Sequence, residues 1–162
     1  MRKIFWLLLS VCLLLAGCTG DKDDGMIAGK FGEPVETAFL TFTVSGAHWG
    51  EPPEGQTGAD GKQYLWVELQ LRNTTSADQP LYYDEFDLYI GGEPRFPERV
   101  TSSRQLEENQ LLAAGADVTG CLVYLVPTGA SDLKLVYEEY YQGDSPGQQF
   151  KVALEKKNIA SE

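Results

Sequence analysis

Few side chains in this sequence could serve as a nucleophile or a general base. His48 is the single histidine, so a Cys–His or Ser–His–Asp arrangement would have to combine it with Cys121 or with a serine. Cys121 lies in an apolar run, where a thiol more often packs as a small hydrophobic group than reacts. The two residues share no motif spacing. We therefore expect no catalytic residues, with a small envelope hydrolase that uses His48 or loop carboxylates as the alternative.

Carboxylates are the other side chains that could take part in catalysis or bind a metal ion. Glu51, Glu54 and Asp60 share one loop and could coordinate calcium together with backbone carbonyls. The acidic run at residues 21–24 is not followed by the later ligands of an EF-hand loop. One histidine and one cysteine do not complete a structural zinc site. We expect no cofactor and assign no metal ligands, and calcium binding by the loop stays an open alternative.

Aromatic side chains next to turn formers favour a binding function. His48 and Trp49 stand at the start of residues 46–63, which are rich in Gly and Pro and which we interpret as a long loop. Long loops on a rigid scaffold often carry recognition sites, and tryptophan is a frequent interface anchor. For Trp49 the alternative is a structural role, in which it covers one end of the core.

Two further aromatic groups are candidate binding surfaces. Tyr64, Trp66 and Glu68 alternate with apolar residues and should share an outward face. This face could be an aromatic platform for a sugar, or a surface that a neighbouring segment covers. Tyr140 and Tyr141 form a second cluster near a predicted turn.

The N-terminus indicates a lipid anchor. A basic start precedes an apolar run at residues 4–16, which is shorter than the about 20 apolar residues that a membrane span requires. The run ends in Leu15-Ala16-Gly17-Cys18, which resembles the lipobox of bacterial lipoproteins. That resemblance implies cleavage between Gly17 and Cys18, acylation of Cys18, and attachment to the outer face of the bacterial cytoplasmic membrane.

The charge of the chain limits its partners. The formal net charge is −11, and removal of residues 1–17, which carry two basic and no acidic residues, makes it more negative. Nucleic acids and anionic lipid surfaces are therefore poor partners. We expect the membrane to be reached through the lipid on Cys18, and a protein or a cell-wall glycan to be the binding partner.

The hydrophobic pattern predicts an all-β fold. Apolar and polar residues alternate, or apolar residues run together, in six short segments separated by clusters of Gly, Pro, Asn and Asp. The segments are residues 38–46, 64–73, 85–90, 121–126, 133–140 and 150–154. This pattern is typical of an antiparallel β-sandwich. Residues 121–126 are apolar on both faces and should form a central strand, and residues 102–114 could contain a short helix.

We divide the chain accordingly. Residues 1–17 are a signal peptide, and residues 18–34, rich in Gly and Asp, form a flexible linker after the lipidated cysteine. Residues 35–157 form the sandwich, and residues 158–162 are a C-terminal tail.

The order of strands and turns resembles a family of immunoglobulin-like, telokin-like domains of unknown function in lipoproteins and secreted proteins of Gram-positive bacteria. Secreted mycobacterial immunogenic proteins share its sandwich. The matching segments are Leu65–Asn73, Phe86–Leu88, Leu112–Gly115, Gly120–Pro127 and Leu133–Tyr137. The resemblance covers roughly residues 35–155. It implies an immunoglobulin-like sandwich held outside the membrane by lipid, and it offers no catalytic residues to carry over.

The most consistent function is a non-enzymatic interaction or ligand-binding module at the bacterial cell surface. The alternatives are the small hydrolase named above and a passive structural or antigenic surface protein. The sequence departs from the family pattern at residues 46–63 and at Cys121, and we expect any function specific to this protein to be found there.

Overall fold

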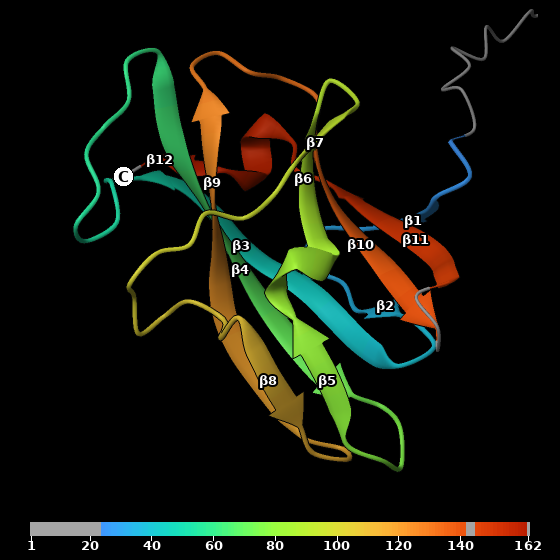
Figure 1. The fold of residues 1–162 in the computed structure, drawn as a ribbon. Coiled ribbons are helices and arrows are strands. Elements are labelled where there is room, and N and C mark those ends of the chain that lie inside the picture. The colour runs from blue at the N-terminus through green and yellow to red at the C-terminus, as the bar shows by residue number, and fades with distance from the viewer. Residues whose placement is uncertain (1–23, 142–144, 162) are drawn as a thin grey trace, which may run out of the picture.

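Two β-sheets face each other across an apolar core in the computed structural model, which describes residues 24–141 and 145–161 (Figure 1). Sheet A contains, in spatial order, β1 (Ile27–Gly29), β11 (Ser145–Ala153), β10 (Leu133–Tyr141), β6 (Phe86–Ile90) and β7 (Glu93–Arg95). Sheet B contains β12 (Ala160–Ser161), β3 (Leu40–Gly50), β4 (Lys62–Asn73) and β9 (Asp117–Pro127), and β2 (Val35–Glu36) pairs with β3. Sheet C is the pair β5 (Gln79–Tyr82) and β8 (Asn109–Leu112).

The predicted antiparallel β-sandwich is confirmed, with two parallel additions at the sheet edges. β1 runs parallel to β11, and β12 runs parallel to β3. Two 3₁₀ turns, η1 (Tyr83–Glu85) and η2 (Lys156–Asn158), are the helical segments of the described residues. The other pairs within the three sheets are antiparallel, as the short turns between alternating segments predict.

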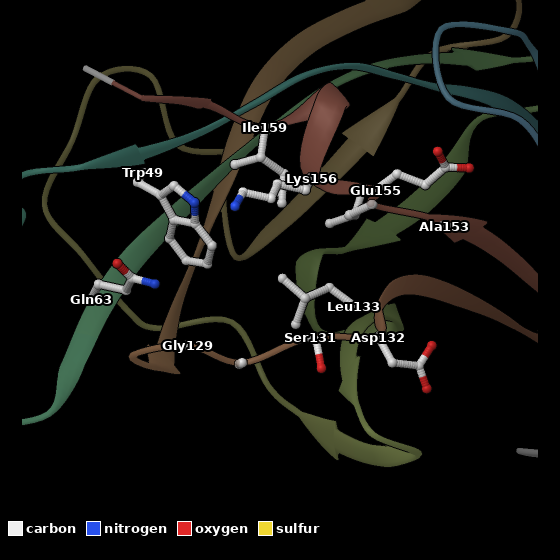
Figure 2. A pocket seen from close by; sticks show the side chains of 12 residues that line it. Trp49, Gln63, Gly129, Ser131, Asp132, Leu133, Ala153, Glu155, Lys156 and Ile159 are labelled. Atoms are coloured by element: carbon white, nitrogen blue, oxygen red, sulfur yellow. The ribbon is translucent and has the colours of Figure 1, made fainter.

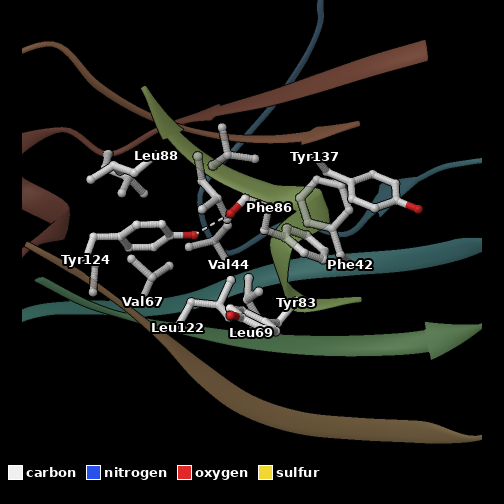
Figure 3. Close-up of a cluster of buried hydrophobic side chains, with 14 of the residues drawn as sticks. Phe42, Val44, Val67, Leu69, Tyr83, Phe86, Leu88, Leu122, Tyr124 and Tyr137 are labelled. Atoms are coloured by element: carbon white, nitrogen blue, oxygen red, sulfur yellow. Dashed lines mark hydrogen bonds between the residues drawn. The ribbon is translucent and has the colours of Figure 1, made fainter. Parts of the chain in front are cut away.

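Aromatic rings dominate the centre of the core (Figure 3). Phe42 of sheet B contacts Phe86 and Tyr137 of sheet A, with both pairs of ring centroids 5.6 Å apart. Tyr124 is fully buried, and its hydroxyl donates a hydrogen bond of 2.8 Å to the carbonyl oxygen of Phe86. A buried phenol needs such an acceptor, because an unpaired polar atom in the core is costly. The bond therefore ties β9 to β6 across the sandwich.

A β-bulge in β3 sets the direction of the side chains that follow it. Val44 pairs with Leu69, but Gly46 pairs with the adjacent residue Glu68, so Ser45 is an extra residue in the strand. Before the bulge the even-numbered residues face the core. After it the odd-numbered ones do, so His48 faces outward and Trp49 faces inward. The prediction that His48 and Trp49 lie in a loop is wrong: β3 continues to Gly50, and the loop spans residues 51–61.

A buried asparagine organises one end of the molecule. Asn73, at the end of β4, is 1% exposed, and its amide nitrogen donates to the carbonyl oxygens of Ala77, Leu112 and Ala113. Its Oδ1 atom accepts hydrogen bonds from the backbone and the hydroxyl of Thr75. The side chain thus joins the turn after β4 to the end of β8.

The segment 98–106 covers the free edge of β9. Cys121 N donates to Arg104 O at 2.7 Å, and Leu106 N donates to Cys121 O at 3.1 Å. The prediction of a central strand at residues 121–126 is therefore wrong, since β9 lies at the edge of its sheet and its apolar outer face is buried by this segment. A short helix within residues 102–114 is also wrong. Turns and β8 occupy that stretch, because its apolar residues pack as strand and edge cover.

Both ends of the described chain belong to the fold. Ile27–Gly29 form β1 against β11, and Asp24 forms an ion pair of 2.6 Å with Lys151. The described part of the predicted linker at 18–34 therefore contains β1, whose backbone pairs with β11. The predicted tail at 158–162 likewise contains β12.

Candidate functional site

Two aromatic rings lie side by side on the outer face of sheet B. His48 and Trp66 are paired residues of β3 and β4, and their rings are nearly parallel, with an interplanar angle of 8° and centroids 6.3 Å apart. Gly50 lies beneath the indole: a Cβ atom there would come within 2.9 Å of the ring of Trp66. The missing side chain lets the indole lie over β3. We call His48 and Trp66 the aromatic platform.

Two loops surround the aromatic platform and turn it into a shallow pocket of about 330 Å³. Residues 51–54 form one wall, and Trp66 Nε1 donates to the carbonyl oxygen of Glu51 at 3.3 Å. Residues 101–104 form the other wall. The pocket therefore combines aromatic faces with hydroxyl, carboxylate and guanidinium groups. Glu51 and Glu54, predicted as loop carboxylates, line this pocket, whereas Asp60 does not.

Tyr64 is not part of this exposed surface. The prediction of an outward, accessible Tyr64 is wrong, because the side chain is 4% exposed under the loop that follows β3. Its hydroxyl donates to Gln56 Oε1 at 2.9 Å, and Gln56 in turn donates to the carbonyl oxygen of Arg99. Tyr64 thus holds the two loops around the platform together. A neighbouring segment therefore covers Tyr64, as the alternative for this face predicts, but it leaves Trp66 partly exposed.

Glu68 and Arg104 continue the outer face next to the platform. Their side chains form an ion pair of 2.7 Å, and a Cβ atom on Gly46 would meet the Glu68 carboxylate. Cys121, opposite Glu68, is 1% exposed, and its thiol donates to the carbonyl oxygen of Arg104. Burial raises the pKa of this thiol, which disfavours the reactive thiolate. The prediction that Cys121 packs as a small hydrophobic residue is confirmed.

Trp49 lines a different and larger pocket. This end pocket has a volume of about 630 Å³ and opens between the two sheets, enclosed by Trp49, the start of β10 and η2 (Figure 2). Its walls are mostly apolar, and they include Trp49, Leu133, Leu154 and Ile159. Trp49 is partly buried against the core. The structure therefore combines both interpretations of Trp49: it covers the end of the core and lines a cavity, but it does not share a site with His48.

A family comparison covers most of this architecture. Residues 29–147 match the model of a family described as a domain of unknown function, DUF4352. The chain belongs to the DUF4352 family. The matched region contains both residues of the aromatic platform, but the part of the end pocket formed by residues 153–159 lies beyond it. No curated protein matches the chain.

Solved structures share the sandwich of this DUF4352 protein. The yjhA protein of Bacillus subtilis is 22% identical, with a TM-score of 0.63 over 81% of this chain and 99% of its own. The ycdA protein of Bacillus subtilis, described as a candidate lipoprotein, is 19% identical, with a TM-score of 0.62 over 77% of this chain, and the match spans 40% of ycdA. MPT63, a secreted protein of Mycobacterium tuberculosis, is 12% identical, with a TM-score of 0.57 over 78% of this chain and 97% of its own. These likenesses establish the fold.

Tyr140 and Tyr141 lie away from both pockets of the DUF4352 domain. β10 begins with Leu133 at the end pocket and ends with the two tyrosines, which are 48% and 44% exposed. Tyr141 packs edge-on against Phe39, and its hydroxyl donates to the buried carboxylate of Glu139. The structure therefore does not bring these tyrosines together with His48, Trp49 or Trp66.

Sequence reasoning did not identify two partly buried carboxyls, Glu85 at the end of η1 and Asp87 on β6 of sheet A. Asp87 faces away from the buried Phe86, but its Oδ1 atom is buried without a hydrogen-bond partner among the described residues. Burial raises the pKa of Asp87 to about 6, and Glu138 adds to the effect. Burial also raises the pKa of Glu85 to about 7. Alternation of residues identifies the face that these side chains occupy, but not how far it is buried.

Within residues 24–141 and 145–161 no group of three or more His, Cys, Asp or Glu side chains is arranged to hold a metal ion. No helix in the described part of the DUF4352 protein is long and apolar enough to cross a membrane. Gly17 and Cys18, the predicted cleavage and lipidation residues, lie outside the described residues.

Proposed function

We propose that this protein is a lipid-anchored binding module on the outer face of a bacterial cytoplasmic membrane, and that it binds cell-wall glycans without catalysing a reaction. The lipobox-like motif that ends in Cys18 supports the anchor. The descriptions of ycdA as a candidate lipoprotein and of MPT63 as a secreted protein support a location outside the cytoplasm. We also propose that the strands of the sandwich have an immunoglobulin-like arrangement, as in the family that the sequence resembles.

The aromatic platform carries the proposal for a glycan. The apolar face of a pyranose packs on an aromatic ring, while its hydroxyls need polar partners around the ring. His48 and Trp66 provide nearly parallel rings, and Glu51, Glu54 and Arg104 surround them. A shallow pocket with polar walls suits a sugar better than it suits an apolar ligand.

Replacement of Trp66 by alanine is expected to weaken glycan binding at least ten-fold, since truncation of an anchoring tryptophan at a binding surface costs about 2 kcal/mol or more. The test uses residues 18–162 with Cys18→Ser, and titrates soluble peptidoglycan fragments by calorimetry. Trp49→Ala is the matched control, because Trp49 faces the opposite side of sheet B and should leave glycan affinity unchanged. Equal affinity of Trp66→Ala and the parent protein would contradict the platform.

The same titration separates the proposal from the other function classes. No binding by the parent protein would favour a protein partner or a passive surface role. The hydrolase is favoured by one observation, that His48, Glu51 and Glu54 line a single pocket. Chromatography of the fragments after incubation tests it: release of shorter fragments that is lost in Glu54→Gln would replace binding with hydrolysis as the function.

Cys18→Ala is expected to abolish incorporation of labelled fatty acid and to release the protein from the membrane fraction, because Cys18 is the cysteine of the lipobox-like motif. Labelling in the native bacterial host and cell fractionation measure the two effects. Cys12→Ala is the matched control, since it lies within the predicted signal peptide and should leave labelling intact. Full labelling of Cys18→Ala would refute the anchor.

A further inference from the structure

We infer that the end pocket binds an amphiphile with an apolar chain and a single anionic head group, such as a long-chain carboxylate. This site is separate from the aromatic platform. It lies between the sheets and not on their outer face, and none of its lining residues contributes to the platform pocket.

The walls of the end pocket favour an apolar chain. Trp49, Leu133, Leu154 and Ile159 line it from both sheets and from the segment after β11, and Ala130 adds to the apolar surface. A volume of about 630 Å³ lies within the usual range of small-molecule sites, about 300–1,000 Å³. Burial of an alkyl chain against these side chains removes apolar surface from water on both partners.

The charges around the pocket select the head group. Three charged side chains line it: Asp132, Glu155 and Lys156. The Asp132 carboxylate is paired with Lys134 at 3.4 Å, and the Glu155 carboxylate is paired with Lys157 at 2.6 Å. Both of those lysines lie outside the pocket lining.

Lys156 is the one lining charge without an ion pair among the described residues. Its side chain extends toward Trp49 across the pocket (Figure 2). The local balance is therefore one uncompensated ammonium group beside an apolar cavity, although the chain as a whole is strongly acidic. An anionic head group satisfies this ammonium while the chain enters the cavity.

Tryptophan fluorescence tests the site separately from glycan binding. Residues 18–162 contain two tryptophans, so Trp66→Phe leaves Trp49 as the single reporter in the end pocket. In this variant, also carrying Cys18→Ser, dodecanoate below its micelle concentration is expected to change the fluorescence saturably. Dodecyltrimethylammonium, with a chain of the same length, should bind at least ten-fold more weakly.

Lys156→Gln is expected to lower the affinity for dodecanoate at least ten-fold, or about 1.4 kcal/mol, and to leave the affinity for neutral dodecanol unchanged. Lys30→Gln is the matched control, because it changes the net charge equally but lies away from the pocket. Thermal melting of each variant verifies folding.

Four outcomes would overturn the inference. Absence of saturable dodecanoate binding would reject an apolar ligand in this pocket. Equal affinity for the anionic and cationic probes would reject the selective role of Lys156, as would an unchanged affinity in Lys156→Gln. Displacement of dodecanoate by acetyl-Leu-Leu, with a higher affinity for the peptide than for dodecanoate, would reassign the site to a peptide carboxyl terminus. Each result is independent of glycan binding, which Trp66 reports in the Trp49→Phe variant.

Discussion

Replacement of Asn73 by alanine is expected to lower the free energy of unfolding by about 3 kcal/mol. The amide donates to three carbonyl oxygens at 2.8, 2.9 and 3.1 Å, and the side-chain oxygen accepts two hydrogen bonds. A buried polar group that loses its partner costs about 1–3 kcal/mol, and at Asn73 several groups lose theirs together. Urea unfolding, with an unchanged dependence on denaturant concentration, measures the loss as a shift in midpoint.

Two further variants sharpen this test. Asn109→Ala removes the same atoms from an exposed position of β8 and should change stability by about 0.5 kcal/mol or less. Asn73→Asp places a carboxylate against three carbonyl oxygens and should be at least as destabilising as alanine at neutral pH. At low pH the carboxyl of Asn73→Asp is protonated and can donate a hydrogen bond. A recovery of stability there would support the hydrogen bonds from residue 73 to the three carbonyl oxygens. An Asn73→Ala loss no greater than that of Asn109→Ala would contradict it.

Stability is also expected to fall by about 2 kcal/mol as the pH rises from about 5 to about 8. Burial raises the pKa of Glu85 from 4.5 to about 7 and that of Asp87 from 3.8 to about 6. Between the ordinary and the raised values the native state binds more protons than the unfolded chain, so each increase in pH favours unfolding. The cost is absent below about pH 4 and complete above about pH 7. Both carboxyls are partly exposed, so solvent screening reduces it.

The double variant Glu85→Gln, Asp87→Asn is expected to be more stable than the parent protein at pH 8 and to lose most of this pH dependence. Glu107→Gln with Asp60→Asn, two exposed positions, is the matched control. Below about pH 4, Asp24 acts in the opposite direction, because its hydrogen bond and ion pair with Lys151 lower its pKa. Melting temperatures across the pH range measure the effect, and equal profiles for parent and double variant would contradict it.

The predictable parts of this protein are those that depend on alternation and turn chemistry. Leu65, Val67, Leu69 and Leu71 alternate with polar residues and form the inner face of β4, so the β-sandwich follows from the sequence. The immunoglobulin-like arrangement and the lipid on Cys18 remain predictions. The helix within residues 102–114 was wrong because local helix propensity competes with long-range packing of Leu106 and Leu112.

The candidate site was only partly predictable, because it depends on long-range register. Trp66 was identified as an outward aromatic residue, and His48 was identified as a binding candidate. Their adjacency requires the pairing of β3 with β4. Alternation separates Trp49 from His48, but the bulge at Ser45 decides that Trp49 faces the core, and no residue pattern around that serine indicates the bulge. The charge balance at Lys156 depends on two short-range ion pairs, Asp132 with Lys134 and Glu155 with Lys157, and on the packing that brings both beside the end pocket.

The extra residue in β3 has a consequence for sequence variation. If Ser45 paired regularly instead of forming the bulge, the register of the following residues would shift by one position, so that the imidazole of His48 would face the core and the indole of Trp49 would face solvent. Deletion of Ser45, in contrast, would remove the extra residue and keep both side chains on their present faces. Such a change of register would remove the aromatic platform and the Trp49 wall of the end pocket together. Point substitutions at His48 or Trp49 alter one surface at a time, whereas loss of the bulge with Ser45 retained alters both.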